Sequence, residues 1–236
     1  MKALLTVLIC LSLAACSGNA IRNKDGTASE RGLSLSGIAK SDVDDITELT
    51  QREAIACLRR LAEKLYRRNP SELGKSPRQG LDAAMADIFD PLNHWHLSAR
   101  RSLDWQASIN SAFDANYPGD RIAAMMKGLL TMVMASYGHK TEIYILDSLD
   151  PQKLYNAARN IEIVAWRLAN ARNDRREPLL LSNGQDPDGI ANLSFEREFG
   201  KLIAVQDLGA RIVEGKTNRA IRFTVVNVAT LVFLPI

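Results

Sequence analysis

This sequence lacks several features that would identify an enzyme or a membrane-spanning protein. Its 236 residues contain no G-x-S-x-G and no H-E-x-x-H pattern, so the signatures of a serine hydrolase and of a zinc hydrolase are absent. The uninterrupted apolar parts of its two most apolar segments, residues 3–13 and 119–137, fall short of the roughly 20 residues that cross a bilayer. The charges nearly balance, with 30 basic and 27 acidic side chains, and this balance indicates no nucleic-acid partner.

What the chain does have is an N-terminus with the organisation of a secretory leader. Lys2 precedes the apolar segment 3–13, whose length is typical of a signal peptide. The segment ends in Leu13-Ala14-Ala15-Cys16, which resembles the lipobox of bacterial lipoproteins. The resemblance implies cleavage before Cys16, so that 1–15 are a signal peptide, and acylation of Cys16 with palmitate-type chains. An unmodified secreted protein, cleaved at the same place, is the alternative.

The residue after the cysteine bears on location. In Gram-negative lipoproteins an Asp there favours the inner membrane, and this chain has Ser17. The resemblance therefore implies an outer-membrane anchor with the body facing the periplasm. Residues 16–40 are small, polar and aperiodic, which predicts a lipidated N-terminus followed by a flexible tether. Such a tether has a root-mean-square reach of roughly 25–30 Å.

Cysteine is scarce, with three in the chain. Cys10 would leave with the signal peptide and Cys16 would carry lipid, so Cys57 would be the one remaining thiol. A lone thiol forms no internal disulfide and offers no partner for a metal or redox pair. Because Cys57 falls on an apolar helical stripe, it is expected to be a buried small hydrophobe.

Residues 41–236 predict a single-domain, all-α bundle of about six to seven helices. The spacing of apolar side chains predicts helices over residues 41–68, 77–89, 104–114, 119–137, 150–171, 194–213 and 218–233. The segment 119–137 is apolar nearly all the way round, which predicts a buried central helix. Residues 142–146 and 223–228 are rich in β-branched or aromatic residues and are alternative short strands. Isolated strands need partners, so the all-α fold is favoured.

The helix over residues 41–68 has the clearest boundaries. Ser41 and Asp44 have the spacing of a capping box, and Asn69-Pro70 ends the helix. Its apolar stripe is expected to be buried along its whole length; the stripe contains Ile46, Leu49, Ala54, Cys57, Leu58, Leu61 and Leu65.

The histidines are the candidate metal ligands. His94, His96 and His139, together with Glu142, could supply three nitrogens and a carboxylate. However, His94 and His96 are two residues apart, which places them on opposed faces of a helix. They converge only in an extended segment, so the sequence predicts neither a metal site nor a cofactor.

Lys127 is the one charge within the apolar part of the central segment. A buried lysine must find a partner or lose its charge. Asp87, Glu162 and Glu198 lie on other predicted helices and are the candidate partners. The alternative is a ligand-facing role, which makes Lys127 the candidate pocket residue.

The chain offers no coherent catalytic constellation, and we assign no catalytic residues. The first hypothesis is a non-enzymatic, membrane-tethered helical adaptor or assembly factor that binds another envelope protein. It predicts an exposed apolar patch. A ligand-binding bundle is the second and predicts an apolar cavity beside Lys127; it is suggested by Met125, Met126, Met132 and Met134. A cell-wall hydrolase is the third and needs converging acids, drawn for example from Glu142, Asp147 and Asp150.

Overall fold

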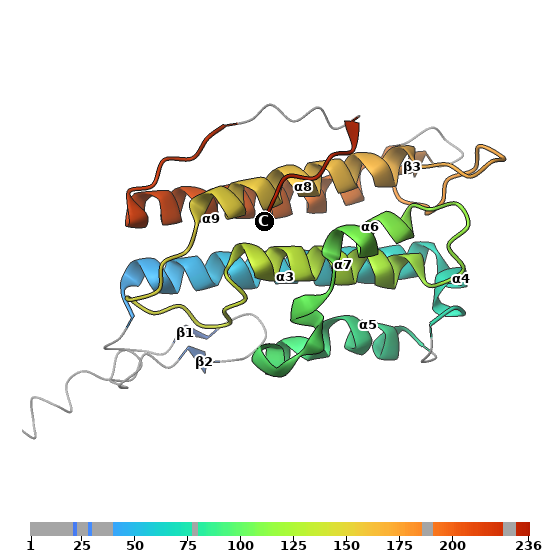
Figure 1. Ribbon diagram of the computed structural model, residues 1–236. Coiled ribbons are helices and arrows are strands. Elements are labelled where there is room, and N and C mark those ends of the chain that lie inside the picture. The colour runs from blue at the N-terminus through green and yellow to red at the C-terminus, as the bar shows by residue number, and fades with distance from the viewer. Residues whose placement is uncertain (1–20, 23–27, 30–39, 77–79, 186–190, 224–229) are drawn as a thin grey trace, which may run out of the picture.

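The computed structural model of the chain is an all-α helical bundle (Figure 1). It describes residues 21–22, 28–29, 40–76, 80–185, 191–223 and 230–236. This described part contains seven α-helices: α3 (Asp42–Arg68), α4 (Pro70–Leu73), α5 (Leu81–Phe89), α6 (Trp105–Ala112), α7 (Arg121–Ser136), α8 (Pro151–Asn170) and α9 (Ser194–Thr217). Two 3-10 helices, η1 (Asp90–Leu97) and η2 (Ala99–Ser102), follow α5. The predicted single-domain helical fold is confirmed.

In the ranges that the structure describes, four short strands pair in two antiparallel ladders. β1 (Ile21–Arg22) pairs with β2 (Ala28–Ser29), and β3 (Gly184–Gln185) pairs with β4 (Ala191–Asn192). Residues 142–146, an alternative strand, form an irregular segment with a turn and no strand. Of the other alternative strand, residue 223 is not in a strand, and residues 224–228 lie outside the described residues. The rest of the predicted signal peptide and tether, including Cys16, lies outside the described residues, and their assignment stays a prediction.

The helices are arranged in three layers. α8 and α9 lie side by side in one layer, α3 and α7 form the next, and α5 with the 3-10 helices covers the far side of α3 and α7 (Figure 1). The most extensive contacts join α9 to α8 and to α3, and α6 to α7. None of the helices in the described ranges is long and apolar enough to cross a membrane.

α7 is the central helix, as its sequence predicts. Every residue of α7 is buried except the half-buried Ala123, Lys127 and Ala135. Gly128 permits the close approach of α6, because a Cβ there would lie 2.6 Å from Ile109 Cγ1. Absence of a side chain at this position is therefore what lets α6 pack against α7.

The helix starts follow the capping residues of the sequence. The Ser41 hydroxyl accepts the Asp44 N–H at 3.3 Å, and the Asp44 carboxylate accepts the Ser41 N–H at 2.9 Å, which completes the predicted capping box of α3. Asp150 accepts the Gln152 N–H at 2.9 Å and caps α8. These local hydrogen bonds satisfy amides that the helix itself leaves without a partner.

The helix predicted over residues 218–233 is wrong. α9 extends to Thr217 and ends at Asn218 in the left-handed conformation (φ 52°). Residues 219–223 and 231–236 are not helical, and 224–229 lie outside the described residues. The last residues instead run along α8. There Asn160 donates to the Leu234 carbonyl at 2.9 Å and accepts the Leu234 N–H at 2.7 Å.

The predicted burial of Ile46 and Leu49 is also wrong. Their exposed fractions are 47% and 58%, whereas the rest of the predicted stripe, Ala54, Cys57, Leu58, Leu61 and Leu65, is fully buried. Near its N-terminus α3 buries polar residues in their place; these are Asp44, Thr47, Glu48, Thr50 and Gln51. The reason is a set of polar partners that other segments bring to this end of the bundle.

Candidate functional site

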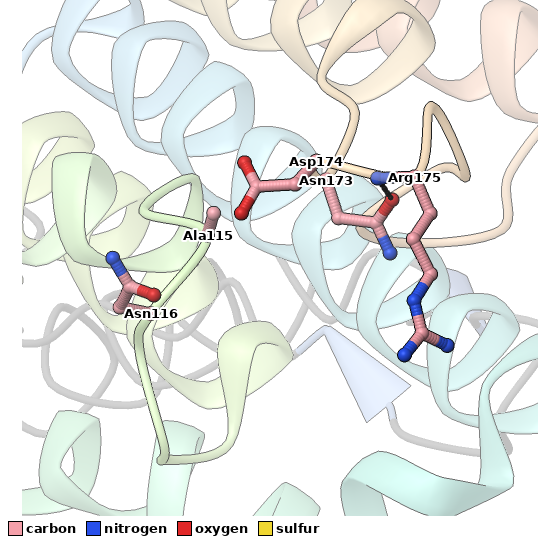
Figure 2. Close-up of a pocket in the computed structure, with 5 residues that line it drawn as sticks. All are labelled: Ala115, Asn116, Asn173, Asp174 and Arg175. Carbon is pink, nitrogen blue, oxygen red and sulfur yellow. Dashed lines mark hydrogen bonds between the residues drawn. The ribbon is translucent and has the colours of Figure 1, made fainter.

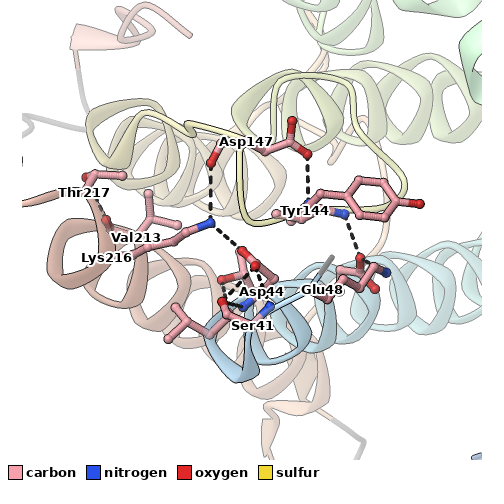
Figure 3. Close-up of polar contacts among 12 residues, drawn as sticks. Ser41, Asp44, Glu48, Tyr144, Asp147, Val213, Lys216 and Thr217 are labelled. Atoms are coloured by element: carbon pink, nitrogen blue, oxygen red, sulfur yellow. Dashed lines mark hydrogen bonds and ion pairs between the residues drawn. The ribbon is translucent and has the colours of Figure 1, made fainter. Parts of the chain in front are cut away.

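Charged side chains from three segments meet at the N-terminal end of α3 (Figure 3). The segments are the start of α3, the loop over residues 139–149 and the last turns of α9. We call this group the α3-end cluster; it consists of Lys40, Asp44, Glu48, Lys140, Asp147 and Lys216. Figure 3 shows the Lys216 ammonium between Asp44 and the Asp147 segment of the loop.

Asp44 is the fully buried member of the cluster. Its carboxylate pairs with Lys216 and accepts hydrogen bonds from the Ser41 N–H at 2.9 Å and the Ser41 hydroxyl at 2.7 Å. Burial alone raises the pKa of Asp44, but the hydrogen bonds from Lys216 and Ser41 outweigh it and hold the pKa below its usual value. Asp44 is therefore ionised in the folded protein at neutral pH.

Glu48 joins the loop to Lys40, the last residue of the predicted tether. Its carboxylate accepts the Ile143 N–H at 2.6 Å and pairs with Lys40 at 2.5 Å. Burial by itself lowers the pKa of Lys40. The hydrogen bond to Glu48 and the negative charge of Glu48 raise this pKa by more, so the net shift is upward. The Lys40 ammonium also lies 5.1 Å from the centre of the Tyr144 ring. Lys40 thus contacts the loop.

Two contacts within the loop and one from α3 hold the loop further. Asp147 accepts the Tyr144 N–H at 2.9 Å and pairs with Lys140 at 2.8 Å. Gln51, a buried residue of α3, donates to the Lys140 carbonyl at 2.7 Å. The loop is therefore held at several points along its length.

At the tip of this loop two large apolar side chains face solvent. Ile145 is 56% exposed and Leu146 is 93% exposed, whereas the neighbouring Ile143 is buried. We call Ile145 and Leu146 the loop tip. Because the polar contacts on either side fix the backbone, the exposure of the tip belongs to the folded conformation of the loop.

A second exposed apolar surface lies on α3 and α9. Ile46 and Leu49 project from α3, and Leu208, 53% exposed, projects from α9 beside the half-buried Ile212. We call these four residues the α3/α9 face. Exposed charged residues of both signs lie on the same two helices within about two turns of these residues, namely Arg52, Glu53, Lys201 and Arg211.

The register of the two helices places these residues on one surface. α3 and α9 run antiparallel, and Arg60 of α3 pairs with Glu198 of α9 at 2.9 Å. Ile46 precedes Arg60, and Ile212 follows Glu198, each by about four helical turns. Ile46 and Ile212 therefore lie on the facing edges of neighbouring helices.

The three histidines are not brought together. His94 and His96 are exposed, while the fully buried Trp95 between them stacks on His139 with ring centres 6.0 Å apart. Burial lowers the pKa of His139, and the charges of Arg101 and Lys153 lower it further. Within the described ranges no group of three His, Cys, Asp or Glu residues could hold a metal ion.

Lys127 forms an ion pair with Asp87, one of its three predicted partners. Cys57 is fully buried, as predicted. The four methionines of α7 are fully buried and belong to the main hydrophobic core. A ligand-facing role of Lys127 stays a prediction.

The predicted acids have local partners. Asp150 caps α8, Asp147 braces the loop, and Glu142 accepts a hydrogen bond from the Tyr144 hydroxyl. A cavity of about 170 Å³ lies elsewhere, between the turn after α6 and the loop after α8 (Figure 2). It is lined by Ala115, Asn116, Asn173, Asp174 and Arg175. Asn173 Oδ1 accepts the Arg175 N–H at 2.9 Å, so this polar lining is partly satisfied by its own turn.

The sequence analysis missed the α3-end cluster, although one signal for it was present. Residues 44, 47, 48 and 51 continue the helical spacing of the buried stripe, but all four are polar. Polar residues on a buried face require polar partners from elsewhere in the fold.

Comparison of the chain with protein-family models, curated proteins and solved structures found no match.

Proposed function

We propose that this protein is a lipoprotein, acylated at Cys16 and anchored in the outer membrane. We further propose that its helical body acts in the periplasm as a non-enzymatic adaptor or assembly factor that binds another envelope protein. The anchor rests on the lipobox-like residues 13–16. The adaptor role rests on one observation, the α3/α9 face.

The α3/α9 face has the composition of a protein-binding surface. Its centre is apolar and its surroundings carry both signs of charge, as in interfaces with an apolar core and a polar rim. Burying an exposed Ile or Leu side chain in a partner is worth about 1.5–3 kcal/mol before the costs of association. Ile46, Leu49 and Leu208 are exposed in the isolated body, so a partner that buries them gains affinity.

The position of the face on two long helices supports the same role. α3 and α9 are joined to each other by ion pairs at both ends, Asp44 with Lys216 and Arg60 with Glu198. The apolar side chains between these pairs are therefore presented on a fixed backbone. A preorganised surface loses less conformational entropy on binding than a mobile one.

The proposal is tested by site-specific cross-linking in intact membranes. A photoreactive residue at Leu49 or Leu208 is expected to join the body to the same envelope protein. One at Leu97, which is 77% exposed on η1, serves as the control and is expected to give no such product. The product is expected to be lost in a Cys16→Ala variant, because the anchor raises the local concentration of the partner.

Two results would contradict the proposal. Equal cross-linking from Leu97 and Leu49 would mean that the α3/α9 face is not the binding surface. Recovery of the wild-type protein in the soluble periplasmic fraction would contradict the proposed lipid anchor at Cys16.

A further inference from the structure

The exposure of the loop tip is imposed by contacts that hold the rest of the loop. Ile143 is buried with its N–H on the Glu48 carboxylate, and Asp147 accepts the Tyr144 N–H. Ile145 and Leu146 stand between these two fixed points and face solvent. In a loop free to rearrange, Leu146 would turn inward, because exposure of 93% of an apolar side chain to water is unfavourable. The held conformation therefore suits contact of the tip with an apolar surface outside the molecule.

The loop tip lies at the end of the bundle where the N-terminal segment joins the body. Lys40, the last residue of the predicted tether, pairs with Glu48 and lies over the ring of Tyr144, next to the tip. The opposite end of the 27-residue α3 is about 40 Å away. That distance exceeds the roughly 25–30 Å reach expected of a tether between Cys16 and Lys40. An acylated Cys16 therefore places this end of the bundle, on average, nearer to the bilayer than the opposite end.

The chemistry of the tip fits the surface of a bilayer. An isoleucine and a leucine project together, and the half-buried Tyr144 beside them is of a residue type enriched at membrane interfaces. The charges nearby are of both signs, with Lys140 opposed by Glu142 and Asp147. Insertion at this site would therefore depend on apolar contact and little on the charge of the lipid.

We infer that Ile145 and Leu146 insert into the surface of the bilayer that holds the anchor, and so orient the bundle end-on. This inference rests on the proposed acylation of Cys16. It adds a second, non-covalent contact with lipid and leaves the α3/α9 face free for a protein. The occupant of the tip is the lipid surface itself.

The test uses full-length acylated protein in vesicles made of phosphatidylethanolamine and phosphatidylglycerol, with the same lipid composition in every measurement. An environment-sensitive fluorophore is attached at Ser148→Cys, an exposed position beside the tip. Leu193→Cys, 58% exposed at the far end of the bundle, is the matched control. Cys57 is fully buried and does not compete for the label.

The expected result is an emission shift to shorter wavelength at position 148. Quenching by lipids with a spin label near the headgroup is expected to be several-fold stronger there than at position 193. Both signals are expected to disappear in an Ile145→Asp, Leu146→Asp variant whose thermal unfolding is unchanged. Raising the salt concentration is expected to leave them in place.

Three results would overturn the inference, and they differ from one another. Vesicle-bound protein with equal, solvent-like emission at positions 148 and 193 rejects the insertion but leaves the anchor standing. A shift that disappears when the protein is diluted with lipid assigns the tip to a second copy of the chain. Protein that does not float with the vesicles rejects the acylation at Cys16 and, with it, this inference.

Discussion

The Lys216 ammonium pairs with the Asp44 carboxylate across 172 residues of sequence and joins the last turn of α9 to the first turn of α3. Asp44 is fully buried, and Lys216 also reaches the Asp147 carbonyl at 3.4 Å. One lysine thus links α3, α9 and the loop that carries Ile145 and Leu146. Lys216 is the counter-charge of the buried Asp44 at this end of the bundle.

Replacing Lys216 with Met is expected to lower the free energy of unfolding by about 3 kcal/mol, because it leaves the buried Asp44 carboxylate without its counter-charge. The measurement is denaturant unfolding at pH 7. Lys201→Met is the control, since Lys201 pairs with Glu198 in a 52% exposed position and is expected to change stability by less than about 1 kcal/mol. Equal losses in the two variants would contradict the role given to Lys216.

The same pair predicts the acid side of the stability profile. The native pKa of Asp44 is lowered, so its contribution is fully present above the unfolded value of about 3.9 and is lost as pH falls through the native value. In Lys216→Met this acid-dependent loss is expected to shrink. If the free energy of unfolding fell equally with pH below pH 4 in the wild type and in Lys216→Met, the pairing of Lys216 would not be the cause of the lowered pKa of Asp44.

Gly128→Ala is expected to destabilise the bundle by about 1–3 kcal/mol, despite the better helix propensity of alanine. The added Cβ would lie 2.6 Å from Ile109 Cγ1 and 2.9 Å from the Trp105 carbonyl oxygen, so α6 must move. Gly200→Ala in α9 is the matched control, because nothing lies within 4 Å of its Cβ position. Calorimetric melting is expected to move down for the first variant and slightly up for the second.

Asp120 predicts a pH dependence of the opposite sign. Burial raises the pKa of Asp120, and hydrogen bonds from the Ala123 N–H and the Tyr66 hydroxyl only partly oppose it. The native state therefore binds the proton more tightly than the unfolded state, and this contribution declines as pH rises through the native value. Asp120→Asn keeps an acceptor for the Ala123 N–H and removes this decline. Its stability relative to wild type is expected to improve between pH 4 and pH 7, as measured by urea unfolding.

Asn160 predicts how the C-terminal segment is held. It is fully buried in α8 and makes two hydrogen bonds with the backbone of Leu234. Asn160→Ala is expected to release residues 231–236 and to cost about 1–3 kcal/mol, because the Leu234 groups lose their partner. Hydrogen exchange at the Leu234 amide is expected to accelerate. Unchanged protection there would show that other contacts hold the segment.

The starts of α3, α6, α7 and α8 could be predicted to within two residues because they are set locally. Each of these helices begins at a side chain that accepts a hydrogen bond from a backbone amide two or three residues later. The accepting residues are Ser41, Asp104, Asp120 and Asp150. Such contacts need no distant partner, so the sequence alone is sufficient to place them. The helix predicted after Asn218 failed for the opposite reason. Within its range Arg222 exchanges two hydrogen bonds with Gln152, which is 70 positions away. Leu234 and Pro235, directly after the range, bind Asn160 and Asn156, which are more than 70 positions away.

The candidate surfaces could not be predicted in the same way. Periodicity placed Ile46 and Leu49 in the core, because it weighs each side chain by its own hydrophobicity. In the structure Glu48 and Gln51 take the buried positions, since the loop over residues 139–149 offers them the Ile143 N–H and the Lys140 carbonyl. A pattern within one helix contains no information about such partners.

The helical class, the starts of the long helices and the buried character of α7 follow from the order of the residues, since these features depend on spacing and on contacts between near neighbours. The sequence also carries the lipobox-like residues on which the proposed anchor rests. The buried face of α3, the carboxylate that pairs with Lys127 and the apolar side chains that remain exposed are set by the packing of distant segments. The physical reason is that the free energy of a buried charge or polar group depends on the partner brought to it, and that partner comes from a distant part of the chain.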